Sequence, residues 1–190
     1  MAQSRERLFL LGSRRDCPMI NYPLPHKTKV TCADVLEDLL DPAIAALLSG
    51  GKRCNHGDAS IARFAATKPG SVEPISRFRR IAADGVAPTL LAGTTSAAAK
   101  VAGKGGRFSP KKVIHYAEPR SCTVRELARL HGIPDFVTFE DSICGPSQRI
   151  GNSVPPPLAK AVAKEVRQAV IFARVGHEFS AKMTASSAAC

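Results

Sequence analysis

Lysine and arginine are the residues whose type and distribution in this chain most directly suggest a binding chemistry. The 190 residues include 27 Lys+Arg and 16 Asp+Glu, a net charge of +11. Most of the excess lies in residues 13–112, which hold 16 basic and 8 acidic residues. Such a stretch indicates a polyanion partner, most simply nucleic acid, although composition does not choose between DNA, RNA and anionic lipid. The alternative is an ordinary basic surface.

The six cysteines do not follow the spacing of a metal site. No two of them form C-x-x-C, and Cys54 with His56 would supply only half of a zinc ligand set. We therefore predict no metal ion and reduced thiols. The sequence also has no secretory signal and no apolar run of about 18 residues, so we expect no membrane span and a cytoplasmic or nuclear location.

The elements that must position these residues begin with one strand and two short helices. The apolar run at residues 8–11 predicts a strand buried on both faces, as in a parallel sheet. Thr31 and Asp34 resemble a capping box that opens a helix, which Asp41-Pro42 interrupts. A second short helix is expected at residues 43–48, before two glycines.

The middle of the chain is predicted to be irregular. Residues 50–112 are interpreted as loop and short strands, the clearest strand being at residues 89–92. Residues 93–107 are small and basic and predict a mobile loop. Regular structure is expected to return at Val113 and Ile114.

Two further helices are predicted near the C-terminus. Thr123 and Glu126 form a capping box for a helix that a glycine and a proline soon end. The three prolines at residues 155–157 fit the first turn of a longer helix that runs to about Phe172, followed by a frayed tail at residues 177–190. Its apolar face has near-helical spacing and consists mainly of Leu158, Ala161, Val162, Val166, Ala169 and Val170.

Three segments give the chain a family resemblance when taken in order. They are residues 3–12 (QSRERLFLLG), residues 120–135 (RSCTVRELARLHGIPD) and residues 148–158 (QRIGNSVPPPL). They resemble motifs VIII, IX and X of DNA cytosine-5 methyltransferases. Between the first two, Arg79-Arg80-Ile81 and then Pro88-Thr89-Leu90 resemble the pattern that precedes the family's variable DNA-reading loops. The resemblance covers roughly residues 2–172.

The resemblance implies an α/β fold class: the C-terminal portion of a Rossmann-like methyltransferase domain, with an inserted small target recognition domain that is mostly β or irregular. Residues 1–16 would supply the motif VIII strand of the catalytic domain, and residues 17–112 a linker and the target recognition domain. Residues 113–175 would return to the catalytic domain through the motif IX and X helices. Residues 176–190 would be a flexible tail.

The resemblance also implies a reaction and roles for two arginines. In the family, a cysteine thiolate attacks C6 of a flipped cytosine, and C5 takes a methyl group from S-adenosylmethionine. Arg7 would bind O2 of the flipped base, because a guanidinium stays charged and donates hydrogen bonds to an oxygen that gains negative charge. Arg5 would be a supporting or phosphate contact. The alternative is that both arginines only end a strand in solvent.

Further roles follow from the same resemblance. Asn152, Ser153 and Val154 would close the methionine end of the cofactor site, although Asn152 or Ser153 could equally cap the following helix. Four residues are candidates for DNA contacts, with an ordinary solvated basic face as the alternative: Arg77, Arg79, Arg80 and Thr89. Three others are expected to be structural and to join the small domain to the large one: Arg125, Glu126 and Arg129.

Three family elements are missing from this sequence. It contains no F-x-G-x-G cofactor loop, no Pro-Cys dipeptide with the nucleophile and no Glu-Asn-Val segment. We therefore expect the target-recognition half of an enzyme, inactive alone, which shares S-adenosylmethionine with a complementing N-terminal half and binds double-stranded DNA. Such a chain would be a subunit of a split enzyme, a truncation or a gene model begun at an internal Met. The alternatives are a stand-alone DNA-binding module and a nonfunctional remnant.

Overall fold

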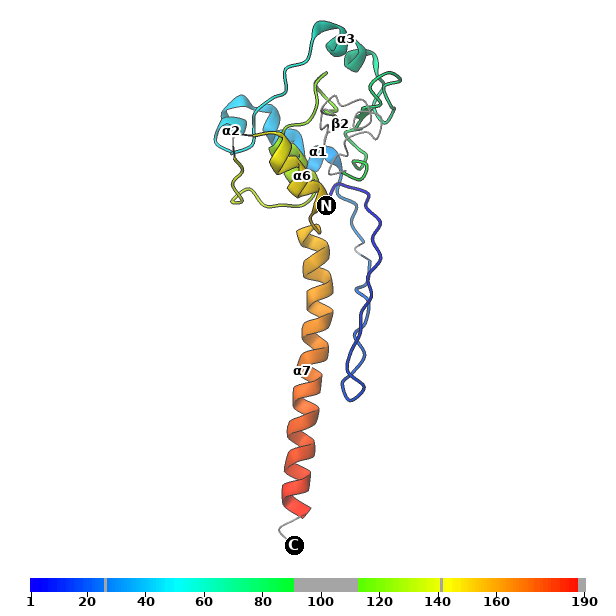
Figure 1. The fold of residues 1–190 in the computed structure, drawn as a ribbon, viewed down its shortest axis with the longest axis vertical. Coiled ribbons are helices and arrows are strands. Elements are labelled where there is room, and N and C mark those ends of the chain that lie inside the picture. Colours follow the sequence, from blue (N-terminus) through cyan, green and yellow to red (C-terminus); the bar gives the residue numbers. More distant parts are fainter. Residues whose placement is uncertain (26, 91–112, 141, 188–190) are drawn as a thin grey trace, which may run out of the picture. The chain divides into compact units, whose positions relative to one another are not determined.

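The chain forms two compact units, each built from segments far apart in the sequence (Figure 1). The structure is a computed structural model that describes residues 1–25, 27–90, 113–140 and 142–187, with side chains up to residue 175. The first unit consists of Met1–Glu6 and Thr28–Pro156, and the second of Arg7–Lys27 and Pro157–Cys190. The chain passes from the first unit to the second between Glu6 and Arg7, so Arg5 and Arg7 belong to different units.

The first helix of the first unit begins where the sequence predicts. In α1 (Cys32–Leu36), the Thr31 hydroxyl accepts a hydrogen bond from the Asp34 amide at 3.3 Å, and the Asp34 carboxylate accepts one from the Thr31 amide at 2.8 Å. This reciprocal pair confirms the predicted capping box. The 3-10 helix η1 (Glu37–Leu40) follows α1 directly.

The second helix also follows its local signals. In α2 (Pro42–Ala46), the Asp41 carboxylate accepts a hydrogen bond from the Ala43 amide at 2.8 Å. Asp41 is thus the N-cap and Pro42 fills the first turn, where a missing N–H costs nothing. The predicted interruption at this dipeptide is confirmed, and the helix begins one residue earlier than expected.

Helix α3 (Asp58–Ala66) lies in a stretch interpreted from the sequence as loop and strand, and that interpretation was wrong. Its N-cap, Gly57, makes no side-chain capping bond, and Phe64 is its one buried residue. Such a helix has little local signal. Contacts with rings outside the helix stabilise it, because the Phe64 ring lies 5.3 Å from that of Phe78 and 5.1 Å from that of His56.

A two-stranded parallel sheet holds the middle of the first unit. β1 (Arg79–Arg80) pairs with β2 (Val113–Ile114), with Arg79 opposite Val113 and Arg80 opposite Ile114. The expected return to order at Val113 is confirmed, and both β2 residues are buried. Residues 89 and 90 form no strand, and the rest of that predicted strand and the loop at 93–107 lie outside the described residues.

The strand predicted at residues 8–11 is absent, so that prediction was wrong. These residues have no regular secondary structure, and Leu8 and Leu10 are each 86% exposed. A strand exists only when a neighbour pairs with its backbone groups. Among the described residues, the two named strands pair with each other and leave no partner for this segment.

Two helices complete the core of the first unit. α5 (Val124–Leu130) starts at the predicted capping box of Thr123 and Glu126 and ends before Gly132, whose φ of 80° suits glycine. α6 (Cys144–Asn152) was not predicted, because its sequence CGPSQRIGN has little apolar periodicity. The buried apolar core combines residues of α1, η1, β2, α5 and α6 with residues outside the helices and strands: Ala2, Cys32, Leu36, Leu39, Ile81, Ala87, Leu90, Val113, Cys122, Val124, Leu127, Ala128, Leu130 and Ile150.

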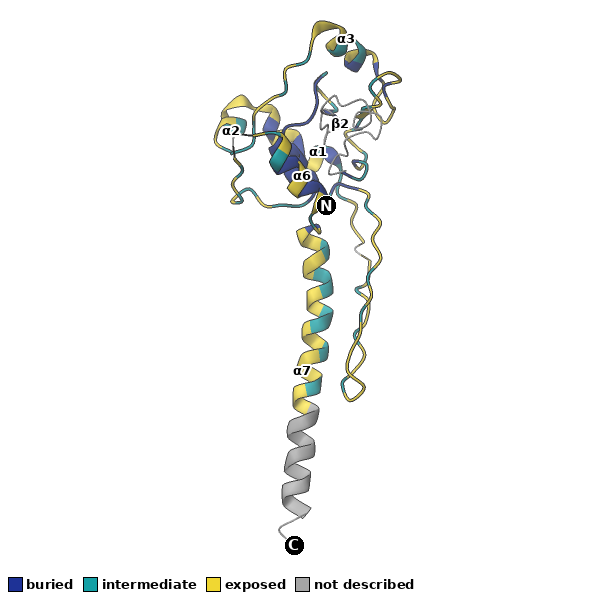
Figure 2. Ribbon diagram, in the orientation of Figure 1, coloured by how far each residue is buried: buried dark blue, intermediate teal, exposed yellow. Residues whose placement is uncertain are grey.

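The last helix, α7 (Pro156–Ser187), starts at the predicted prolines but is longer than predicted. It continues beyond Phe172 to Ser187, through most of the stretch expected to be frayed, and no proline follows Pro157 to end it. No residue from 156 to 175 is buried, although a stripe of half-buried residues runs along one face (Figure 2). None of the helices in the described part of the chain is apolar enough over a sufficient length to cross a bilayer.

Candidate functional site

The buried imidazole of His131 joins the three segments that resemble family motifs. His131 is fully buried at the C-cap of α5. Its Nδ1 lies 2.8 Å from Oε1 of Gln3, and its Nε2 lies 3.0 Å from the hydroxyl and 3.2 Å from the carbonyl oxygen of Ser153. One side chain therefore links the N-terminal segment, the end of α5 and the turn after α6. Nothing in the sequence marked His131 for this role.

The N-terminal segment is also bonded along its backbone to residues 87–89. The Ser4 amide donates to the Ala87 carbonyl at 2.8 Å, and the Ala87 amide donates to the Ala2 carbonyl at 2.8 Å. The Thr89 hydroxyl donates to the Ser4 carbonyl at 2.9 Å. Thr89, a candidate for DNA contact, is therefore placed against the N-terminal segment.

Arg5 fixes the same segment at its other end. Its half-buried guanidinium donates to the carbonyl of Gly151 at 2.9 Å and to that of Leu90 at 3.3 Å. Arg5 therefore does not end a strand in solvent. It instead brings the N-terminal segment next to Gly151, which directly precedes the residues suggested for the cofactor site.

Arg7 belongs to the second unit. Its exposed side chain lines a groove of about 310 Å³ between segment 7–23 and α7, beside Leu158 and Val162. A second groove of about 450 Å³ lies farther along the same face of α7, beside Val166 and Ala169. The groove that Arg7 lines is therefore formed mainly by apolar side chains.

Asn152, Ser153 and Val154 lie at the turn between α6 and α7. Asn152 is the last residue of α6 and Ser153 its C-cap, and α7 begins only at Pro156. The alternative that Asn152 or Ser153 caps the last helix was therefore wrong. The Ser153 hydroxyl donates to the Ile150 carbonyl at 2.9 Å, whereas the side chains of Asn152 and Val154 are exposed.

The candidate DNA-contact arginines are used in different ways. Arg80 donates to the carbonyls of Phe64, Ala65 and Thr67 at the end of α3, at 3.1–3.3 Å, and to Tyr116 at 3.0 Å. Its guanidinium therefore caps a helix within the fold. Arg77 and Arg79, in contrast, have exposed side chains.

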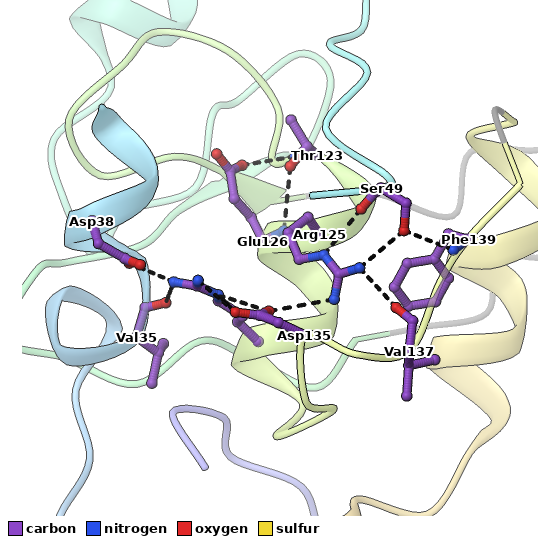
Figure 3. Close-up of polar contacts among 10 residues, drawn as sticks. Val35, Asp38, Ser49, Thr123, Arg125, Glu126, Asp135, Val137 and Phe139 are labelled. Atoms are coloured by element: carbon purple, nitrogen blue, oxygen red, sulfur yellow. Dashed lines mark hydrogen bonds and ion pairs between the residues drawn. The ribbon is translucent and has the colours of Figure 1, made fainter. Parts of the chain in front are cut away.

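Arg125 is a buried structural arginine, as the sequence predicts. Its side chain is 2% exposed and donates to the Ser49 carbonyl at 3.0 Å, the Ser49 hydroxyl at 3.1 Å and the Val137 carbonyl at 2.7 Å (Figure 3). It also lies 4.9 Å from the centre of the Phe139 ring. These contacts hold α5 to the loop at Ser49, which is far away in the sequence, and to the loop at Val137 and Phe139, which follows α5.

Arg129 extends this network to the first helices. Its guanidinium donates to the Asp135 carboxylate at 2.6–3.1 Å, to the Val35 carbonyl at 3.2 Å and to the Asp38 carboxylate (Figure 3). Hydrogen bonds from Arg129 keep the pKa of Asp135 below its ordinary value, against a smaller opposing effect of burial. These contacts of Arg125 and Arg129 fix α5 in the first unit, and with it His131, the C-cap residue of α5.

A buried ion pair lies at the other end of α5. Arg120 donates to the Glu126 carboxylate at 2.7 and 2.9 Å, and Glu126 also accepts from the Thr123 amide at 2.7 Å. Burial by itself raises the pKa of Glu126, but the hydrogen bonds and charge of Arg120 outweigh it, and the pKa is lowered. The carboxylate thus stays ionised and caps the helix.

The part of the chain that the structure describes contains no cluster of three or more His, Cys, Asp or Glu side chains that could hold a metal ion. The polar groups brought together are instead arginine, glutamine, histidine and serine. The contacts among these groups in the structure are hydrogen bonds.

Comparison with known proteins points to one family. The sequence model of the family described as C-5 cytosine-specific DNA methylase matches residues 1–168 of this chain. Type II methyltransferase M.XorII of Xanthomonas oryzae is 34% identical over 209 residues, an alignment covering 88% of this chain and 47% of M.XorII. Type II methyltransferase M.MthTI of Methanothermobacter thermautotrophicus is 32% identical, with 87% of this chain and 52% of M.MthTI covered.

A solved structure shows a similar fold. It is the crystal structure of a protein described as a prophage-encoded DNA modification methyltransferase (E. coli), with a TM-score of 0.58 and 24% identity. The match covers 84% of this chain and 51% of that one. The helices and small parallel sheet are thus arranged as in a methyltransferase, and the chain spans about half the length of the proteins it matches.

Proposed function

Because the chain belongs to the C-5 cytosine-specific DNA methylase family, we propose that it is the C-terminal, target-recognition part of a DNA (cytosine-5-)-methyltransferase. Residues 1–16 carry motif VIII, residues 17–112 the linker and target recognition domain, and residues 113–175 motifs IX and X. The observation that carries the proposal is the family match over residues 1–168 in a chain that spans about half of its relatives.

The proposed role of the chain in the reaction is to read DNA and to hold the flipped cytosine. Arg7 donates hydrogen bonds to O2 of that base and stabilises negative charge that develops on the ring. Arg5 has a supporting role, because its bonds to Gly151 and Leu90 hold the N-terminal segment within the first unit. The attacking cysteine belongs to the other half of the enzyme.

Asn152 and Val154 would contact S-adenosylmethionine. Their exposed side chains provide a hydrogen-bonding amide and an apolar surface at one turn, which fits the amino-acid end of the cofactor. The Ser153 hydroxyl already bonds within the fold, so Ser153 would act through its backbone. The cofactor supplies the methyl group. Most of its pocket would come from the other half.

DNA binding would use the exposed Arg77 and Arg79. Arg80 and Thr89 would support them from within the fold, since both side chains bond to backbone carbonyls. A protein with this substrate works where the DNA is, which is the nucleoid in the cytoplasm of a prokaryote or the nucleus of a eukaryote.

The complementing partner would be a polypeptide that carries F-x-G-x-G and Pro-Cys, either a separate chain or a preceding segment. Two surfaces of the second unit support this proposal. Leu8 and Leu10 are each 86% exposed, and α7 has exposed apolar residues such as Ile171 and Phe172. A complementing polypeptide that packs against these side chains would bury apolar surface that a lone domain rarely exposes.

The proposed DNA binding is tested by measuring the affinity of the purified chain for duplex DNA as a function of salt. Contacts with several phosphates release counterions, so affinity should fall by orders of magnitude, about 10³-fold or more, between 50 and 200 mM salt. A neutral polymer of similar length serves as the control and should not bind. Salt-insensitive binding, or equal affinity for the neutral polymer, would refute DNA recognition by this chain.

A further inference from the structure

Residues 71–80 form a hairpin whose tip has an unusual backbone. The Arg80 amide donates to the Ser71 carbonyl at 2.9 Å, and the Glu73 amide donates to the Phe78 carbonyl at 2.7 Å. Four residues, 74–77, connect the two arms. The last of them, Arg77, has a φ of 63°, in the left-handed region. Glycine favours that region, and a residue with a Cβ is strained there.

Glu73 stabilises this tip from the inside. Its side chain is 1% exposed, and its carboxylate accepts hydrogen bonds from the Ile75 amide at 3.2 Å and from both the amide and the hydroxyl of Ser76. Arg63 forms an ion pair with it at 3.3 Å, and the Glu73 carbonyl accepts from the Arg77 amide at 3.0 Å. The loop is therefore held rigidly although one of its residues is strained.

The hairpin presents only positive charge to solvent. Between residues 67 and 81, the exposed charged side chains are Lys68, Arg77 and Arg79. Glu73 is the one acidic residue of that stretch, and it is buried and paired with Arg63. An anion that approaches the tip thus meets arginine and lysine without a competing carboxylate.

We propose that Glu73 is a positioning residue that holds Arg77 at the hairpin tip as a contact for a DNA phosphate. This inference rests on the proposed function and specifies how one part of the chain would bind DNA. A side chain fixed before binding loses less conformational freedom in the complex, which makes its phosphate contact stronger. The strain at Arg77 persists because Glu73 holds the loop in place.

The proposal predicts that Glu73→Gln changes DNA affinity in the direction opposite to the one that electrostatics alone predicts. Removing a negative charge should strengthen DNA binding, whereas loosening the tip should weaken it. We expect Glu73→Gln to weaken binding of the full chain to a duplex about 3- to 10-fold at 50 mM salt. The matched control is Asp84→Asn, which removes the same charge from an exposed residue and should bind as well as or better than the unmodified chain.

A second pair of variants tests Arg77 itself. Arg77→Gly relieves the strain but removes the cation, so binding should weaken about 5- to 10-fold and the slope of log affinity against log salt should drop by about 1. Its Tm should not fall, because glycine suits this backbone. Arg77→Lys keeps the positive charge and should retain most of the affinity of the unmodified chain for DNA, since a lysine ammonium also binds phosphate.

The outcomes separate this inference from the proposed function. If the unmodified chain does not bind DNA, both fail. If it binds and Glu73→Gln and Arg77→Gly bind equally well, only this inference fails. If Glu73→Gln does not fold, Ser76→Ala replaces it, because this variant removes one bond to the carboxylate at constant charge. It should weaken binding about 2-fold or more, and unchanged binding would overturn the proposal.

Discussion

Replacing Arg125 with methionine is expected to destabilise the first unit strongly. Methionine fills a similar space but donates no hydrogen bond. The change removes the bonds to Ser49 and Val137, the 3.4 Å contact with Asp135 and the packing over the Phe139 ring. Asp135 keeps Arg129 as a partner at 2.6 Å, so the main loss falls on the two backbone carbonyls and the Ser49 hydroxyl.

The magnitude follows from these contacts. Each acceptor that loses its donor at a half-buried site costs about 1 kcal/mol, and the ring contact adds about 0.5–1 kcal/mol. Relief from desolvating a guanidinium offsets part of the sum. We therefore expect a loss of about 2–4 kcal/mol. For a chain of this size, that corresponds to a Tm lower by roughly 5–15 °C.

Differential scanning calorimetry of Arg125→Met measures this loss directly. The matched control is Arg149→Met, because the Arg149–Glu140 pair is 2.9 Å long with side chains 59% and 67% exposed. An exposed pair of this kind contributes about 0–1 kcal/mol. Equal shifts for the two variants would refute the reasoning that burial makes Arg125 important.

Three other perturbations test separate parts of the account. Burial, more than the neighbouring charges, lowers the pKa of His115, so stability should fall as pH drops below about 6.5, by at most about 1.4 kcal/mol per pH unit for one proton. His115→Asn keeps an acceptor for the Ala117 and Glu118 amides, which donate to Nδ1 of His115 at 3.1 and 3.4 Å. It should make the chemical-denaturation midpoint nearly independent of pH between pH 5 and 7; an unchanged pH profile would exclude His115 as the cause. His131→Ala removes the anchor of the N-terminal segment and should speed hydrogen exchange of the Ser4 and Ala87 amides about 10-fold or more by NMR, so unchanged rates would contradict the role of His131. In a reconstituted enzyme, Arg7→Ala should lower kcat on the order of 10²-fold with a smaller change in DNA affinity; full turnover with weaker binding would make Arg7 a phosphate contact.

Elements with strong local signals could be predicted from the sequence. The capping boxes at Thr31 and Thr123 depend on residues three positions apart, and the prolines before α7 act within a single turn. α3 was missed because its stability comes from rings outside the helix, and α6 because its few apolar residues show no period. The prediction of a strand at residues 8–11 was wrong because a strand needs a pairing neighbour, and the described residues supply none for this segment.

The candidate site was predictable only in part, because it also depends on contacts between residues far apart in the sequence. The three motif segments were recognised from resemblance, but their meeting at His131 depends on a contact across 128 sequence positions. Arg80 has the same residue type as the exposed Arg79 beside it, and only the fold shows that it caps α3. Residue type and position in a motif thus indicated candidates but not which of them bond within the protein.

The most direct test of the central claim is a methyl-transfer assay with radiolabelled S-adenosylmethionine and mixed-sequence duplex DNA. The 190-residue chain is measured alone, mixed with an N-terminal half that carries F-x-G-x-G and Pro-Cys, and compared with that half alone. We predict transfer only when both polypeptides are present, because the nucleophile lies on one and the target-recognition surface on the other. Robust transfer by this chain alone would contradict its assignment as the target-recognition half.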